Sequence, residues 1–138
     1  MTPSLLSSST ITMLEQVMQF THRRHAVLAG NIANVDVPGY KSRDLSPEVF
    51  QARLREALEG RSHSYGTGGG SEARGTADRE LAQVAAHVPA LLNHDQSDIG
   101  IEQQVTEISK NQFQHNLAVT ILNSQFHMLQ TAITERLV

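Results

Sequence analysis

Apolar residues near the N-terminus recur at alternating spacings of three and four. The stripe contains Ile11, Leu14, Met18, Thr21, His25, Leu28, Ile32 and Val35. This heptad-like spacing is typical of a helix that packs against another helix. A capping-box pattern from Thr12 to Glu15 places its start near residue 10, and Pro38 disfavours helix in the residue before it. We predict an N-terminal extension at residues 1–9 and a coiled-coil helix over residues 10–36.

A second stripe with the same spacing covers the C-terminal part of the chain. Its members are Ile101, Val105, Ile108, Gln112, His115, Val119, Leu122, Phe126, Leu129, Ile133 and Arg136. No Pro or Gly interrupts the run from Ile101 to Val138, and Asp98 is a candidate N-cap. We predict a helix over residues 98–138, roughly 55 Å long. That length exceeds what a small globule needs, so we expect the two long helices to pair as a coiled coil.

The apolar members of both stripes are the expected packing residues, within the chain or between subunits. They are Ile11, Leu14, Met18, Leu28, Ile32, Ile101, Val105, Ile108, Val119, Leu122, Phe126, Leu129 and Ile133. Polar residues interrupt the stripes at Thr21, His25, Gln112 and His115. Such interruptions lower stability but can specify register and partner.

The middle of the chain changes character twice. Ser46-Pro47 opens a short helix with Pro at its first helical position, and Gly60 is a natural stop, so residues 37–60 hold a turn and this helix. Gly, Ser and Thr then dominate residues 61–75, which predicts a flexible loop. Residues 76–93 have helical spacing but contain Pro89, so helix and extended chain both stay open. We therefore treat residues 61–97 as irregular and assign the chain to the all-α class.

Composition removes several functional classes. The chain is 39% apolar but only 4% aromatic, its net charge is −3, and it has no Cys. Disulfides, thiolate catalysis and Cys-based zinc sites are therefore excluded, and no basic patch suggests a nucleic acid. No apolar run approaches the roughly 20 residues of a membrane span, and the N-terminus makes a poor secretory signal. We expect no direct membrane insertion.

Candidate reactive groups are few. His22 and His25 have a spacing that could hold a metal, but no carboxylate or thiolate completes a ligand set. The cluster His94, Asp95 and Asp98 lacks the alternating oxygens of a calcium loop and is better explained as a helix cap. The Gly-rich segment lacks the Lys-Ser or Lys-Thr of a phosphate-binding loop. We predict no catalytic residue, cofactor or metal.

The segment Asn31–Tyr40, which we name the joint, is the most informative part of the chain. Asn31-Ile32-Ala33-Asn34 ends a helix, and Pro38-Gly39-Tyr40 follows as a turn in which Gly favours positive φ. Asn side chains both donate and accept hydrogen bonds, so they can fix a helix end against neighbouring backbone. Arg43 and Asp44 follow. They could be a weak surface pair, or a contact that locks the turn against the helix or a neighbouring subunit.

The joint closely resembles the N-terminal signature of the bacterial flagellar rod and hook proteins, Asn-Ile-Ala-Asn-Ala-x-Thr-Pro-Gly-Tyr. Val35 and Val37 replace the usual Ala and Thr. The flanking segments 24–30 and 41–45 and the C-terminal segment 98–111 are also similar, and the resemblance covers roughly residues 10–60 and 95–137. The short length and the pair Arg43-Asp44 are similar to the family member at the base of the proximal rod.

This resemblance implies a structural, non-enzymatic subunit of the proximal rod in the periplasmic space. The implied partners are further copies of the chain, the rod proteins FlgC, FlgF and FlgG, the MS-ring adaptor FliE, the MS ring FliF and the flagellar type III export apparatus. Export without a cleaved signal peptide is implied too. A paralogue of the FlgC type and a soluble coiled-coil adaptor are the alternatives. An isolated chain is expected to be partly unfolded.

Overall fold

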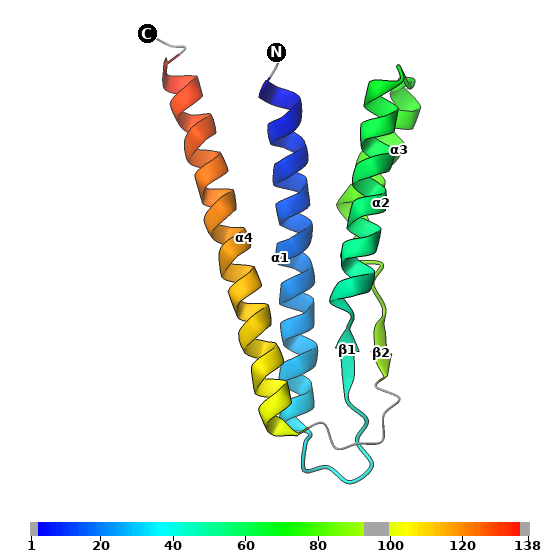
Figure 1. Ribbon diagram of the computed structural model, residues 1–138, viewed down its shortest axis with the longest axis vertical. Helices are drawn as coiled ribbons and strands as arrows, with labels where there is room; N and C mark the ends of the chain where they lie inside the picture. The colour runs from blue at the N-terminus through cyan, green and yellow to red at the C-terminus, as the bar shows by residue number, and fades with distance from the viewer. Residues whose placement is uncertain (1–2, 93–99, 136–138) are drawn as a thin grey trace.

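The computed structural model describes residues 3–92 and 100–135, with side chains described for residues 10–92 and 100–134. Two long antiparallel helices, α1 and α4, lie side by side, and a helical hairpin of α2 and α3 flanks α1 on the other side (Figure 1). A short two-stranded ribbon lies below the hairpin. The start of α1 and the end of α4 are at the same end of the molecule.

Helix α1 covers Pro3–Ala33. It therefore begins well before residue 10, and the predicted extension at residues 1–9 is wrong for residues 3–9, which are helical. Pro3 is compatible with this start, because a proline in the first turn loses no intrahelical hydrogen bond. The capping-box pattern at Thr12–Glu15 lies inside the helix and so does not mark its start. The helix ends where expected, in turns that begin with the Asn34 N–H donating to Asn31 O at 3.3 Å.

Helices α2 (Pro47–Gly66) and α3 (Ser71–Gln83) form the hairpin. The predicted cap is present: Ser46 Oγ accepts a hydrogen bond from the Val49 N–H at 3.3 Å. The predicted stop at Gly60 is wrong, since α2 continues to Gly66, and only residues 67–70 of the expected flexible loop are non-helical. Propensity fails here because the two helices hold each other.

Contacts across the hairpin tip explain why helix replaces loop. Asp78 of α3 pairs with Arg61 Nε at 2.7 Å and accepts a hydrogen bond from the Tyr65 hydroxyl at 2.8 Å. The guanidinium groups of Arg61 and Arg74 lie 5.3 and 5.1 Å from the centre of the Tyr65 ring. Gly69 completes the turn, because a Cβ there would lie 2.6 Å from Ser64 O. The hairpin is thus a specific structure and no linker.

Strands β1 (Arg43–Leu45) and β2 (Ala90–Leu92) form an antiparallel ribbon, with Arg43 opposite Leu92 and Leu45 opposite Ala90. The sequence left both helix and extended chain open for residues 76–93, and the described part of this segment contains both. It is helical through Gln83 and extended from Ala90, directly after Pro89.

The apolar core lies between α1 and the hairpin. Its buried members are Phe20, Leu45, Phe50, Ala57, Leu81, Val84, Ala85 and Val88, with Val17, Val27, Leu54 and Leu58 packed against them. The rings of Phe20 and Phe50 stack with centroids 4.2 Å apart. No residue of α4 belongs to this cluster in the described part of the chain. The sequence stripes placed the apolar packing between the long helices, whereas the cluster of buried apolar side chains lies on the opposite side of α1.

Helix α4 covers Ile101–Glu135 without interruption, as predicted. The proposed cap at Asp98, the cluster of His94 and Asp95, and Arg136 lie outside the described residues. The all-α prediction is confirmed, with the two long terminal helices packed together. None of the described helices is both long enough and apolar enough to cross a membrane.

Candidate functional site

Asn31 is the centre of the joint. It is almost fully buried, and its Nδ2 donates to Arg43 O at 2.7 Å and to Gln104 Oε1 at 3.2 Å. Its Oδ1 accepts from the Arg43 N–H at 3.1 Å and from the Tyr40 hydroxyl at 3.2 Å. One amide side chain therefore joins α1 to β1, to α4 and to the returning turn. No other uncharged side chain offers two donors and a carbonyl acceptor except Gln, which is longer.

The remaining motif residues shape the turn. Asn34 Nδ2 donates to Gly30 O at 2.7 Å and so satisfies a carbonyl in the last turn of α1. Gly39 has φ +78°, in the left-handed region that favours glycine. Ile32 is half-buried, while Ala33 and Pro38 are exposed. The two Asn residues thus do different work: Asn31 makes long-range contacts and Asn34 a local one.

An ion triad around the buried Arg24 ties the same elements together. Arg24 of α1 is 4% exposed and makes two parallel bonds to Asp44, Nε–Oδ1 at 2.9 Å and Nη2–Oδ2 at 2.8 Å. The same Nη2 donates to Glu107 of α4 at 2.8 Å. Lys110 also contacts Glu107, at 2.9 Å. Such bidentate, charge-assisted bonds fix geometry as well as charge, so the triad ties β1 and α4 to one point on α1.

The contacts of the triad shift the pKa values of Arg24 and Glu107. Burial works against the Arg24 cation, but hydrogen bonds to Asp44 and Glu107 outweigh it and raise the pKa of Arg24. The Lys110 hydrogen bond, followed by the one from Arg24, lowers the pKa of Glu107. Both shifts favour the charged forms of Arg24 and Glu107, and so the contact between α1 and α4.

Arg43 and Asp44 were expected to form either a weak surface pair or a contact that locks the turn, and the structure gives the two residues different roles. Asp44 makes the fixed contact that locks the turn against the helix, with Arg24 as its partner. It also accepts a hydrogen bond from the Leu45 N–H at 2.7 Å. The side chain of Arg43 is exposed, and its backbone is what Asn31 holds.

The predicted packing residues are only partly buried within the chain. Leu14 and Leu28 are buried, and Ile11, Met18, Ile108, Val119, Leu122 and Leu129 are half-buried. Ile101, Val105, Phe126 and Ile133 are exposed, so their predicted packing against the other long helix is wrong within this chain. His25 and Gln112 are exposed as well. Packing of these residues against another subunit stays a prediction.

Sequence reasoning missed several residues that build the site. Arg24, Gln16, Gln104 and Asn111 were not singled out, yet all are buried. Gln16 Nε2 donates to Ala82 O and its Oε1 accepts from the Ala85 N–H, both at 3.0 Å. The available signal was the spacing of two amides on α4: Gln104 and Asn111 are seven residues apart and so lie on one face of the helix. It was overlooked because heptad analysis follows apolar residues.

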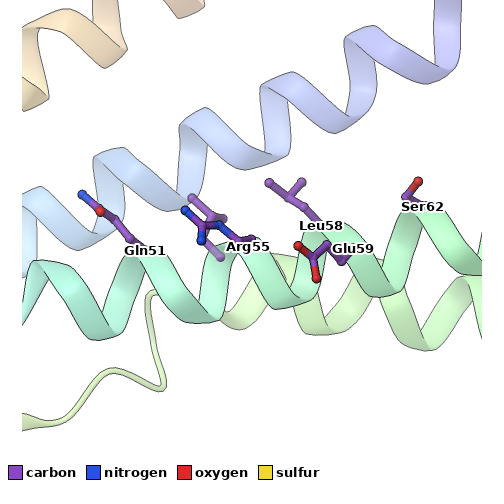
Figure 2. Close-up of a pocket in the computed structure, with 6 residues that line it drawn as sticks. Gln51, Arg55, Leu58, Glu59 and Ser62 are labelled. Atoms are coloured by element: carbon purple, nitrogen blue, oxygen red, sulfur yellow. The ribbon is translucent and has the colours of Figure 1, made fainter.

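Among the described residues we find no arrangement of side chains typical of a catalytic or metal site. A shallow groove of about 480 Å³ is lined by Gln51, Leu54, Arg55, Leu58, Glu59 and Ser62 of α2. Figure 2 shows labelled residues of this set along the α2 helix beside another helical ribbon. Its lining has a Ser but no His that could activate it. His22 and His25 are exposed, and within the described part of the chain no three His, Asp or Glu residues gather to hold a metal.

A comparison with known protein families finds a match in the segment that contains the joint. Residues 18–41 match the family model described as flagella basal body rod protein. A flagellar basal body rod protein FlgB of Bacillus subtilis is 26% identical, with 94% of this chain and 96% of the relative covered. FlgB of Proteus mirabilis is 24% identical over 92% and 95%, and FlgB of Aquifex aeolicus is 26% identical over 91% and 94%. Over most of its length the chain is therefore similar to proteins named flagellar basal body rod protein FlgB, and its joint lies within the segment that matches the family model.

Proposed function

We propose that the chain is a structural subunit of the flagellar proximal rod, of the type its FlgB relatives represent. It would act mechanically and carry out no reaction. The observation that carries the proposal is the surface of α4. From Asn111 to Thr134 the helix contains no Asp, Glu, Lys or Arg, although most of its side chains are exposed in the single chain. Depletion of charge is typical of the core of a protein interface.

Large apolar side chains reinforce this argument. Phe113, Leu117, Ile121 and Met128 of α4 are exposed, Phe113 by 69%. Phe126 and Ile133 are exposed as well. A lone exposed apolar residue needs no explanation, but several on one uncharged stretch of helix indicate an interaction surface. We propose that neighbouring subunits of the rod cover it.

The hairpin contrasts with α4 and suggests an orientation. Its helices carry acidic and basic residues in near balance, including Arg53, Arg55, Glu59, Glu72 and Arg79. A surface with mixed charges suits contact with water. We propose that the α1–α4 side of the subunit faces the inside of the rod wall and that the hairpin faces outward. The joint then fixes the angle between these two parts.

The finer expectations follow from the same proposal. The partners would be further copies of the chain, FlgC, FlgF and FlgG, with FliE and FliF at the base. The subunit would reach the periplasmic rod through the flagellar type III export apparatus without a cleaved signal peptide.

Crosslinking in purified basal bodies tests the proposal. A photoreactive residue at Phe113 or Met128 should crosslink to rod components, whereas one at the exposed hairpin residue Arg79 should do so far less. Because the chain has no Cys, single-cysteine versions offer an independent check. Crosslinks to FliE would favour the FlgB type over the FlgC type. A defined closed oligomer in solution, with no association to basal bodies, would overturn the proposal in favour of a soluble adaptor.

A further inference from the structure

One side of α4 faces α1 along several turns. The residues on that side are buried or half-buried: Gln104, Ile108, Asn111, His115, Ala118, Leu122, Gln125 and Leu129. Their spacing alternates four and three, which is the spacing of a helix packed lengthwise on another. The contact with α1 is therefore regular, and its direction around α4 is well defined.

This side differs from the apolar stripe of the sequence. The contact side and the stripe share four residues: Ile108, His115, Leu122 and Leu129. At the positions between these shared residues, the residue that faces α1 comes one place earlier in the sequence than the stripe residue. Gln104 is 5% exposed where the stripe has Val105, which is 51% exposed. Asn111 is 1% exposed, while its neighbour Gln112 is exposed. One residue is about 100° around a helix, so α4 is turned by about 50°, half of that step, from the stripe.

Burial of apolar surface alone would favour the other setting. The alternate positions that face α1 are Gln104, Asn111, Ala118 and Gln125. The stripe positions beside them are Val105, Gln112 and Phe126, which are exposed, and Val119, which is half-buried. The observed setting thus buries amides and leaves Val105 and Phe126 in water. Something other than the hydrophobic effect selects this side.

Polar contacts with α1 supply the selection. Asn31 Nδ2 donates to Gln104 Oε1 at 3.2 Å, and Asn111 Nδ2 donates to Thr21 O at 2.7 Å. Asn111 Oδ1 has no hydrogen-bond partner in the described structure, so this amide is buried at a cost in stability. A group that costs stability but has one fixed partner is the device that sets register in coiled coils.

Glu107 and His115 add two further contacts with α1. Glu107 reaches Arg24 at 2.8 Å through a long, flexible side chain. His115 lies 2.9 Å from Thr21 and belongs to both the apolar stripe and the observed contact side. Glu107 lies on the same face of α4 as Gln104 and Asn111, so its contact also favours the observed side, but the fully buried members of this polar set are Gln104 and Asn111.

We propose that the buried amides of Gln104 and Asn111 select which side of α4 meets α1, and so keep the apolar stripe at Val105 and Phe126 turned away from the chain's own core. The selection operates within one chain and does not depend on the rod function. Loss of the amides should therefore turn α4 without detaching it.

Cysteine labelling of the purified full chain tests this inference, because the natural chain has no Cys. Val105→Cys reports on the side turned outward and Ala118→Cys on the side turned inward. In an otherwise unchanged chain, Cys at 118 should react with a maleimide about tenfold or more slowly than Cys at 105. Each reporter is then combined with the double change Gln104→Ala and Asn111→Ala. The matched control is Gln112→Ala with Asn116→Ala, two exposed amides of α4 that contact each other at 2.9 Å.

The inference expects the two rates to move in opposite directions in the Gln104/Asn111 variant: position 118 becomes faster and position 105 slower. The control should keep the original order. Fast labelling at both positions would overturn the inference, because the amides would then only hold α4 on α1. Unchanged rates would overturn it too, since the side would be selected without them. Equal rates in the unchanged chain would show that the contacts do not fix α4 at all.

Discussion

The two sides of α1 differ in what holds them. On one side, stacked Phe20 and Phe50 and the apolar residues at the end of α3 form a closed core. On the other side, α4 presents two buried amides and one buried Ala, and Gln104, Asn111 and His115 make polar contacts with α1. Apolar burial gives stability, while directional polar contacts give geometry. This contrast supports the proposal that neighbouring subunits complete the α4 side, while the hairpin side has an apolar core of its own.

The largest expected effect separates the two interfaces directly. Phe20→Ala should lower the free energy of unfolding by about 3–5 kcal/mol, because it empties a buried aromatic site. Leu122→Ala, at a half-buried position of α4, should cost about 1 kcal/mol or less. Urea unfolding followed by circular dichroism measures both. Equal losses in the two variants would contradict the distinction between the interfaces.

The ion triad tests how much of the joint depends on α4. Asp44→Ala should destabilise by about 2 kcal/mol, because it removes two charge-assisted bonds from a buried Arg24. Glu107→Ala should cost about 1 kcal/mol, since Arg24 keeps Asp44 and Glu107 is partly exposed to solvent. The comparison uses the same urea assay. A larger loss for Glu107→Ala would mean that α4 contributes more to the joint than the turn does.

The sequence predicted the elements that depend on local or periodic signals. The long helix α4, the Ser46 cap and the turn at Gly39 all follow from residue type and spacing. It failed where tertiary contacts overrode local preference. Gly60 and the Gly-Ser segment became helical because Asp78 binds Arg61 and Tyr65 across the hairpin.

The site was predictable in part for a related reason. The motif identified Asn31 and Asn34 as structural amides, and Asp44 as a possible lock. The partners of these residues lie far away in the sequence, as Arg24 and Gln104 show, and nothing local marks a buried Arg. The side of α4 that meets α1 was mispredicted because periodicity follows apolar residues, and here amides make the contact.

The turn of the joint offers a test of assembly apart from folding. Gly39→Val places a β-branched residue at φ +78°, which costs about 1–2 kcal/mol locally. Asn34→Ala removes the bond to Gly30 O. Both should impair rod assembly more than export, as measured by motility and by the protein content of purified basal bodies. Gly30→Ala is the matched control, since its Cβ would meet nothing within 4 Å. Normal motility in both variants would contradict an assembly role for the turn.

Acid should weaken the α4 side through Glu107. Its pKa is lowered in the folded chain, first by Lys110 and then by Arg24. A lowered folded pKa means that its contribution is complete above its ordinary pKa and is lost as the pH falls through the folded value. Asp44, Arg24 and Lys110 surround it. The difference in urea midpoint between the natural chain and Glu107→Gln should therefore shrink between about pH 7 and about pH 3. A constant difference would show that the charge of Glu107 is not what matters.

The smallest effect should fall on the hairpin alone. Gly60 lies inside α2, its φ is not positive, and a Cβ there would meet nothing within 4 Å. Gly60→Ala should therefore stabilise the chain by about 0.5–1 kcal/mol, because it removes the backbone entropy that Gly loses in a helix. Gly69→Ala is the opposing control and should destabilise, since its Cβ would lie 2.6 Å from Ser64 O. If Gly60→Ala raises the melting temperature while the labelling rate at position 118 stays the same, the hairpin and α4 are independent. A matching change at position 118 would instead show that stability gained on one side of α1 is transmitted to the other.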